Sequence, residues 1–262
     1  MLNIVQFSNY QYPSERKLAD GLIIPAESTE DLHINEVASE HTSDPIKSVE
    51  DICRISQFLI SNKRYRDNML FIVGINFGLR VSDLRMLRFC NLINNDLTFK
   101  ENFPILEIKT KNTRKHKRNR YITINNAVIQ AVTLYLQHTP YVHLNDYMFT
   151  SNSPNSALCG EPLTRKSIDR ILKGINDDLG IGIHMSTHSL RKTFGYHQMI
   201  VGNNDPRRLL LLSKIFGHSS TIITMDYIGI TTDEIEDAYK DLNLGYMRSF
   251  IDSDIIEDPI AM

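Results

Sequence analysis

The sequence has few cysteines and lacks a long apolar run, and both absences narrow the classes of protein that it can encode. Its three cysteines, Cys53, Cys90 and Cys159, lie far apart and form no C-x-x-C pair. This spacing argues against a disulfide framework and a zinc site, and it fits a reducing cytoplasm. No apolar stretch approaches the ~20 residues that span a bilayer, and no basic region followed by an apolar run opens the chain. We therefore expect a soluble, cytoplasmic protein that is not exported and has no membrane partner.

The net charge of −2 hides an uneven distribution along the chain. Residues 1–50 carry 3 basic and 9 acidic side chains, residues 51–230 carry 24 and 13, and residues 231–262 carry 2 and 9. Within the basic middle, the window 109–120 reads K-T-K-N-T-R-K-H-K-R-N-R and has seven Lys or Arg residues and no acid. Such clustering predicts that the middle of the chain binds a polyanion such as nucleic acid.

The chain divides into three parts by composition. With 262 residues and 42% hydrophobic content, it can bury one large core and still carry extensions. Residues 1–45 are polar and acidic with no sustained period, which predicts a flexible acidic N-terminal extension. One folded domain is expected over residues 46–230, and residues 231–262 are expected to form a C-terminal helix and tail.

Apolar periodicity and capping residues predict that this domain is mainly α-helical. Three short β-like runs, 97–99, 105–108 and 121–124, predict a small three-stranded antiparallel sheet, with the basic window as the long turn between the last two strands. Helices are expected after a capping box that begins at Ser48, over Arg66 to Phe77, after a cap at Asn125 through about Gln137, and from Thr164 to Leu179. Thr187 is expected to cap the helix that carries His188 and Arg191, and Asp205 with Pro206 to open one that ends at Gly217. A short helix is expected to lead to Tyr227, and another to begin at Thr232.

Three residues of the domain have the right chemistry to hold a phosphate. His188 and Arg191 are three apart in T-H-S-L-R-K-T-F, so both side chains project from one face of a helix. Arg80 lies in G-L-R-V-S-D-L, at an elbow between helices where a guanidinium can reach into a cleft, and Asp83 is expected to brace that elbow. Two arginines from different elements can bind phosphate oxygens through paired hydrogen bonds and stabilise a pentavalent transition state. No metal is required for that, and no cluster of metal ligands is visible in the sequence.

A nucleophile for such a phosphate is offered by Tyr227, which follows His218 by nine residues in G-H-S-S-T-I-I-T-M-D-Y. Since a phenol has an ordinary pKa of ~10, it needs a base, and His188 can serve. His218 could donate to a phosphate oxygen, and a lysine of the basic window could protonate the leaving alkoxide. The structural alternatives are a core aromatic for Tyr227, a core histidine at a helix start for His188, and plain phosphate contacts for each lysine.

In this order, the residues resemble the tyrosine recombinases, also called phage integrases. The catalytic domain of that family has an arginine, a hairpin lysine, H-x-x-R, G-H or G-W, and then the tyrosine. The resemblance covers roughly residues 46–230 and assigns the catalytic positions to Arg80, a lysine of 109–115, His188, Arg191, His218 and Tyr227. It implies the tyrosine recombinase catalytic-domain fold and a protein encoded by a bacterium, a phage or a mobile element.

The resemblance also implies a reaction. Tyr227 would attack a backbone phosphate of double-stranded DNA, form a 3′-phosphotyrosine bond and release a 5′-hydroxyl, without a metal or any other cofactor. Members of the family act as four protomers on two DNA sites, some with accessory DNA-bending proteins. The C-terminal segment of one protomer usually docks on its neighbour, which implies a protomer contact for residues 231–262.

Two departures from the family pattern affect the expected site. The basic turn is long, so Lys109 is chosen as the leaving-group acid while Lys111 and Lys115 stay open. The helical core-binding domain of the family, about a hundred residues long, is replaced by some forty-five irregular residues, so we expect the catalytic domain to hold the DNA. The side chains expected to contact DNA are Lys111, Arg114, Lys115, Lys117, Arg118 and Arg120.

Three functional classes are compatible with these residues. The first is a site-specific recombinase that carries out integration, excision or inversion, and it is favoured because every catalytic position is occupied. The second is a type IB topoisomerase, which shares the tyrosine chemistry but is larger and has a long basic clamp. The third is a regulator that binds DNA through a recombinase fold without cutting it, and missing catalytic residues would have supported that class.

Overall fold

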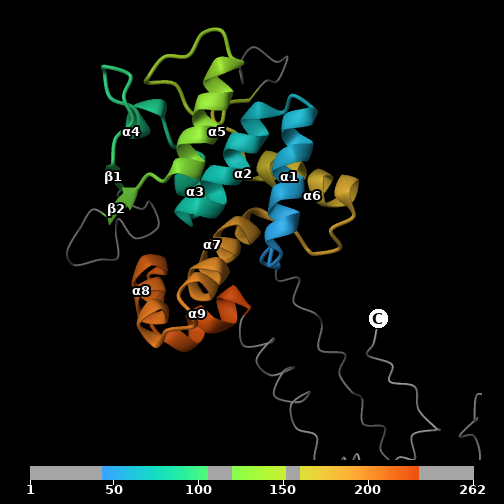
Figure 1. Ribbon diagram of the computed structural model, residues 1–262, viewed down its shortest axis with the longest axis vertical. Helices are drawn as coiled ribbons and strands as arrows, with labels where there is room; N and C mark the ends of the chain where they lie inside the picture. Colours follow the sequence, from blue (N-terminus) through green and yellow to red (C-terminus); the bar gives the residue numbers. More distant parts are fainter. Residues whose placement is uncertain (1–42, 106–119, 152–159, 230–262) are drawn as a thin grey trace, which may run out of the picture. The chain divides into compact units, whose positions relative to one another are not determined.

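The structure, a computed structural model, describes residues 43–105, 120–151 and 160–229, which are mainly helical (Figure 1). This bears out the predicted mainly α fold with a small antiparallel sheet. None of the helices in these ranges is long and apolar enough to cross a membrane. The helices are α1 (Val49–Ser61), α2 (Tyr65–Phe77), α3 (Val81–Leu84), α4 (Phe89–Leu92), α5 (Asn126–Gln137), α6 (Arg165–Leu179), α7 (Thr187–Val201), α8 (Pro206–Phe216) and α9 (Thr221–Ile228), and the strands are β1 (Asn102–Ile105) and β2 (Arg120–Thr123).

Side-chain caps and left-handed glycines set helix boundaries close to where the sequence pattern places them. The side chains of Ser48 and Asn125 each accept a backbone N–H from the first turn of α1 and α5, at 3.1 Å in both cases. At the other ends, Gly78 closes α2 with φ +57° and Gly217 closes α8 with φ +68°. Glycine is favoured there because a Cβ atom is strained in the left-handed region. These signals are local, so the sequence alone could place them.

The N-cap residue of α7 lies one position before the expected one. Ser186, not Thr187, is the N-cap, because its Oγ accepts the N–H of His188 at 3.2 Å and its own N–H donates to Ser189 Oγ at 3.0 Å. The N–H of Thr187 instead donates to Asp169 Oδ1 of α6 at 2.8 Å. Serine and threonine cap helices almost equally well, so the two neighbours could not be separated from the pattern alone.

The sheet has two strands among the described residues, so the predicted three-stranded sheet is not confirmed. The prediction of a strand at 97–99 was wrong, since only an isolated bridge joins Phe99 to Ile93. The chain turns at Leu97, which has φ +67°. Asp96 Oδ1 accepts the backbone N–H two residues further on at 3.0 Å, a turn contact that competes with strand pairing.

The other two expected strands overlap β1 and β2. These pair antiparallel with Asn102 opposite Thr123 and Ile105 opposite Arg120. The predicted strand at 105–108 therefore begins too late, and residues 106–108 lie outside the described residues. The strand predicted at 121–124 agrees with β2 to within one residue at each end.

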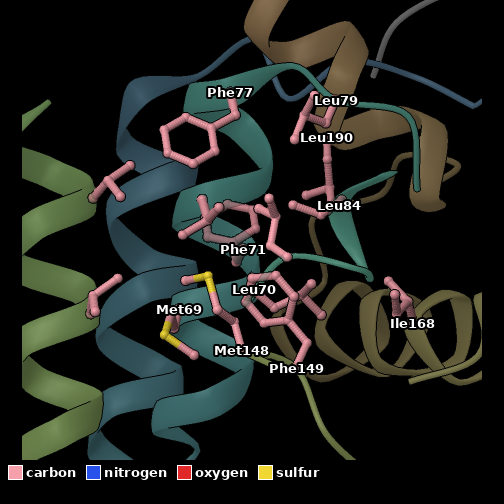
Figure 2. Close-up of a cluster of buried hydrophobic side chains, with 14 of the residues drawn as sticks. Met69, Leu70, Phe71, Phe77, Leu79, Leu84, Met148, Phe149, Ile168 and Leu190 are labelled. Atoms are coloured by element: carbon pink, nitrogen blue, oxygen red, sulfur yellow. The ribbon is translucent and has the colours of Figure 1, made fainter. Parts of the chain in front are cut away.

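Helix α2 lies at the centre of the main core and packs against α1, α5 and α7. Figure 2 shows side chains from α2 and from other segments gathered in one buried cluster, among them Phe71, Phe149 and Leu190. A methyl group added at Gly74 of α2 would lie 2.7 Å from Leu190 Cδ1. Glycine at this position therefore lets α7 pack close to the central helix, because a well-packed interior leaves no room for another carbon atom.

A second, smaller core joins α7, α8 and α9. It is built on four buried side chains, and Gly195 of α7 packs against two of them. A methyl group at Gly195 would overlap Cγ2 of Ile228 and would lie 3.0 Å from the ring of Phe216. The last turn of α8 and the helix that carries Tyr227 thus lie directly against α7. The four side chains are Met199, Leu212, Phe216 and Ile228.

Residues 43–47, here called the N-terminal strap, run along α7 before α1 begins. The N–H of Ile46 donates to Thr193 Oγ1 at 2.8 Å, and the ring of His197 donates to the carbonyl oxygen of Ile46 at 2.9 Å. Asp44 Oδ2 accepts the N–H of His184 at 2.9 Å, just before α7. The strap is therefore bonded to α7 and to the residue just before it, through contacts that the sequence pattern did not single out.

Candidate active site

Five of the six predicted catalytic residues line one cavity, which has a volume of about 710 Å³. They come from the elbow before α3, from the first two turns of α7, from the turn after α8, and from α9. The sixth, Lys109, lies outside the described residues. The cavity is lined by Leu79, Arg80, Val81, Ser82, Arg85, Arg165, Thr187, His188, Arg191, Gly217, His218 and Tyr227.

Arg80 and Arg191 converge because both donate to the same backbone carbonyl. Arg80 Nη2 lies 2.9 Å and Arg191 Nη2 lies 3.0 Å from the carbonyl oxygen of Phe216, the last residue of α8. Arg191 Nη1 also donates to the carbonyl oxygen of Gly78 at 2.6 Å. Carbonyl groups at a helix C-terminus carry partial negative charge, so they attract cations. The two guanidinium groups are thereby held side by side at the cavity.

Arg191 is buried, with 4% of its surface exposed, although it carries a full charge. Its guanidinium also lies 4.2 Å from the centroid of the Phe216 ring, in a cation–π contact. A buried charge is tolerated only when it is hydrogen-bonded or paired. The carbonyl groups of Gly78 and Phe216 meet that need in part, and they leave a positive centre inside the protein.

Tyr227 points its hydroxyl at His188. The Tyr227 Oη atom lies 3.4 Å from His188 Nδ1, and the two rings meet edge to face with centroids 6.5 Å apart. Burial raises the pKa of the Tyr227 phenol, whereas the positive charges of Arg191 and Arg80 and a hydrogen bond with Arg191 act to lower it. The phenol is therefore protonated near neutral pH and stands beside a group that can accept its proton.

His188 is kept in its neutral form by its surroundings. Burial is the largest cause that lowers its pKa, followed by the positive charges of Arg165, Lys192 and Arg191, while Asp169 acts in the opposite direction. A lowered pKa means that the deprotonated imidazole predominates at neutral pH. His188 can therefore act as a proton acceptor without first losing a proton of its own.

His218 is oriented by a short chain of hydroxyl groups. Its Nδ1 lies 3.0 Å from Thr224 Oγ1, which in turn lies 2.8 Å from Ser213 Oγ. Burial and then the charges of Arg191 and Arg80 lower the pKa of His218. Because Thr224 occupies Nδ1, the other ring nitrogen, Nε2, is the one that can serve a group in the cavity.

The remaining predicted residues fall in different places. Asp83 is buried in α3, one turn after Arg80, and its N–H donates to the Arg80 carbonyl oxygen at 2.9 Å. Arg120, at the start of β2, donates from Nη1 to the carbonyl oxygen of Ile215 in α8 at 2.8 Å. The other basic residues expected to contact DNA lie outside the described residues. They are Lys111, Arg114, Lys115, Lys117 and Arg118.

Arg85 and Arg165 line the cavity but were missed by the sequence reasoning. Arg85 Nε donates to the carbonyl oxygen of Leu163 at 2.7 Å. Arg165 Nε lies 3.7 Å from Asp169 Oδ2, at the start of α6. Arg85 is only five residues after Arg80, which was a usable signal. Arg165 reaches the cavity through the packing of α6 against α7, and no local pattern reports that contact.

Lys192 was missed as well, although it directly follows Arg191 in the sequence. Its side chain is buried and its Nζ atom lies 5.4 Å from the centroid of the Tyr227 ring. Burial lowers the pKa of Lys192, and the negative charge of Asp44 on the N-terminal strap acts to raise it.

No group of three or more His, Cys, Asp or Glu residues suited to a metal ion occurs in the part of the chain that the structure describes.

Comparison with known proteins adds a family to this geometry. Residues 46–234 match the model of the phage integrase family. A probable integrase/recombinase of Bacillus subtilis, YoeC, is 36% identical over 200 residues, which cover 76% of this chain and 97% of that protein. The tyrosine recombinase XerA of Thermococcus onnurineus is 23% identical over 195 residues, which cover 74% of this chain and 61% of that one.

Solved structures show the same fold at low sequence identity. A crystal structure of XerA recombinase aligns with a TM-score of 0.54 at 19% identity, covering 79% of this chain and 66% of that chain. XerH site-specific recombinase bound to palindromic difH substrate aligns with a TM-score of 0.53 at 15% identity, covering 85% and 60% of the two chains. The matched region is thus about three fifths to two thirds of these longer relatives.

The family match covers more than half of the chain, and the Bacillus subtilis relative is similar over nearly its whole length. The expectation drawn from the order of the catalytic residues is therefore confirmed. The chain belongs to the phage integrase family, the tyrosine recombinases, and site-specific recombination is the function to which this membership assigns it.

Proposed function

We propose that this protein cuts and rejoins DNA strands through a 3′-phosphotyrosine intermediate on Tyr227. The supporting observation is the position of the Tyr227 hydroxyl, 3.4 Å from His188 Nδ1 in the cavity where Arg80 and Arg191 converge. A nucleophile, a proton acceptor and fixed positive charge are what attack on a phosphodiester requires.

The phosphate is bound by the two arginines and by His218. A guanidinium has five N–H donors in a rigid fork, so Arg80 and Arg191 can keep their bonds to the Phe216 carbonyl oxygen while donating to phosphate oxygens. Nδ1 of His218 lies against Thr224 Oγ1, so Nε2 is the ring nitrogen that remains for a phosphate oxygen, and we propose that Nε2 is protonated when the phosphate binds. That N–H then donates to a third oxygen, and the charge that grows in the transition state is stabilised without a metal ion.

The proton and bond changes follow from this arrangement. The Tyr227 hydroxyl gives its proton to His188 as the phenol oxygen attacks phosphorus, and the bond from phosphorus to the 5′ oxygen breaks. Lys109 is the proposed donor of a proton to that leaving oxygen, with Lys111 and Lys115 as the alternatives. A 5′-hydroxyl of a partner strand then attacks the phosphotyrosine, which rejoins the DNA and frees Tyr227 without any nucleotide.

Duplex DNA is the proposed partner. Four arginines line the cavity, and the basic window that follows β1 adds further positive charge along the chain. Such charge binds the phosphate backbone irrespective of sequence. XerH, which shares the fold, has been seen on a palindromic DNA substrate. The four arginines are Arg80, Arg85, Arg165 and Arg191.

The protein is also proposed to act as a homo-oligomer on DNA. Four protomers would hold two DNA sites together, with accessory DNA-bending proteins as further partners.

The division of the chain remains part of the proposal. Residues 46–230 form the proposed catalytic domain, and residues 1–45 the acidic extension. Residues 231–262 are proposed to contact a neighbouring protomer. Chains truncated to 43–262, which keeps the N-terminal strap, and to 1–230 would test these roles. The first should still form the covalent intermediate, and the second should lose assembly on DNA before it loses single-strand cleavage.

Formation of a covalent adduct tests the proposed reaction. A duplex is first selected for binding to the Tyr227→Phe protein from a randomised library, and it is then nicked at successive backbone positions. We expect the unsubstituted protein to form a detergent-resistant adduct on one nicked duplex, because the short fragment beyond the nick diffuses away and prevents religation. Tyr227→Phe should bind the same DNA and form none. Tyr141→Phe is the matched control, because Tyr141 is 90% exposed and lies away from the cavity.

The alternatives give different results in the same assay. Tight binding with no adduct on any nicked duplex would favour a DNA-binding regulator over the proposed recombinase. Relaxation of any supercoiled plasmid, regardless of sequence, would favour a type IB topoisomerase. An adduct that persists in Tyr227→Phe would refute the assignment of the nucleophile.

A further inference from the structure

Lys192 is a buried cation beside the nucleophile, and the reaction described above gives it no role. Only 9% of its surface is exposed, and its Nζ lies 5.4 Å from the centroid of the Tyr227 ring. Among the residues that the structure describes, its ammonium group forms no hydrogen bond or ion pair. Lysine is almost never buried without a partner, because an ammonium ion loses its hydration there. A function at this position would explain why the side chain is kept inside.

Its placement is fixed by two elements. Lys192 belongs to the second turn of α7, one residue after Arg191, and α7 is held against α9 at Gly195. The negative charge of Asp44 on the N-terminal strap also acts on the ammonium group. The strap itself is bonded to α7 through Thr193 Oγ1 at 2.8 Å. The lysine is therefore held over the ring by packing, so it does not sample the range of positions open to a surface lysine.

We propose that Lys192 is a positioning residue, which holds the Tyr227 ring and stabilises the phenolate form of Tyr227 by its positive charge. The proposal deepens the proposed function, since it concerns the same attack on phosphate. A cation near the ring interacts favourably with the neutral phenol and more strongly with the phenolate. The effect is electrostatic, so Lys192 need not touch the DNA.

The other charged and titratable groups around Tyr227 cannot replace this contribution. Arg80 and Arg191 also favour the phenolate, but a bound phosphate brings negative charge to the same two guanidinium groups and offsets them. His188 takes up the phenol proton and His218 is held by Thr224, so neither is a fixed positive charge. Lys192 is not among the residues that line the cavity, so a phosphate bound there does not pair with its ammonium group directly. Asp44 opposes part of the charge of Lys192.

A direct titration of residue 227 tests the proposal in the DNA-free, full-length protein. A fluorinated tyrosine whose phenol ionises near neutral pH is placed at position 227, so that it titrates while Lys192 is protonated. The pKa of that phenol is read from its single fluorine NMR signal. We expect Lys192→Met to raise this pKa by about one unit, a tenfold change in the ionisation constant, whereas Lys192→Arg keeps it within a fraction of that shift.

Lys47→Met is the matched control. Lys47 Nζ lies 5.8 Å from the centroid of the Tyr196 ring, so this substitution removes a similar lysine–tyrosine contact elsewhere on α7. It should leave the titration of residue 227 unchanged. Thermal unfolding of each variant identifies any that fails to fold, and Lys192→Arg, which retains charge and length, keeps the comparison informative if Lys192→Met is unstable.

Two results would overturn the inference. One is an unchanged pKa of residue 227 in folded Lys192→Met, and the other is an equal rise in Lys192→Arg, because charge would then not be the cause. Neither result depends on DNA cleavage, so this inference and the proposed function can fail separately. If the protein forms the adduct on DNA and the titration does not move, only the role of Lys192 is lost.

Discussion

Replacing Gly195 by alanine should disturb the active site from outside it. The new methyl group would overlap Cγ2 of Ile228 and would lie 3.0 Å from two atoms of the Phe216 ring. Ile228 directly follows Tyr227, the proposed nucleophile, and the carbonyl oxygen of Phe216 accepts from both Arg80 and Arg191. A shift of α8 and α9 away from α7 would therefore move the phenol and the phosphate-binding groups relative to His188.

The size of the effect can be estimated from the packing. Overpacking a close contact costs roughly 1–3 kcal/mol, while alanine in place of glycine inside a helix contributes about 1 kcal/mol of stability. The net change in the free energy of unfolding is thus a loss of about 0–2 kcal/mol. The effect on cleavage should be larger, because a misplacement of about 1 Å in an active site can slow a reaction by about 100-fold.

The assay compares single-turnover adduct formation with chemical denaturation. Gly174→Ala in α6 is the matched control, since nothing lies within 4 Å of a methyl group there, and it should be stabilised with unchanged cleavage. A second substitution, Ile228→Ala, removes the overlapped methyl group and should restore part of the activity to Gly195→Ala. Cleavage at the normal rate in folded Gly195→Ala would refute the argument that this contact sets the geometry of the site.

Three further predictions concern the chemistry itself. Because burial lowers the pKa of His188, the neutral base persists below the ordinary histidine pKa of about 6.5. The rate of single-turnover cleavage should therefore fall only below that pH, as His188 becomes protonated. A fall that begins above that pH would contradict the role of His188 as the base. Thr224→Val removes the hydroxyl group that orients His218 and should slow adduct formation by about 10- to 100-fold with unchanged DNA affinity; an unchanged rate would show that the contact is dispensable. Lys109→Ala should slow cleavage in a way that a bridging sulfur at the 5′ position rescues, and without rescue the acid would be sought at Lys111 or Lys115.

Much of the fold could be predicted because helix ends are marked by nearby residues. Ser48, Asn125 and Gly78 each act within one turn of their own position, so the printed sequence contains the whole signal. The expected strand at 97–99 was wrong because two local signals disagreed. Its apolar residues suggested pairing, but the turn at Asp96 and the left-handed backbone at Leu97 prevented it. Short apolar runs carry too little information to decide between a turn and a strand.

The sequence by itself determined the family to which the chain belongs and named the candidate residues for the proposed chemistry. Residue type and order were sufficient, because an H-x-x-R pair on one helical face and a tyrosine nine residues after His218 are local patterns. Only the tertiary structure decided how they act together. Arg191 is held by the carbonyl of Gly78, 113 positions away, and Arg80 by that of Phe216, 136 positions away. Such contacts, like that of Lys192 with Tyr227, arise when packed helices bring distant residues together, and no local pattern encodes them.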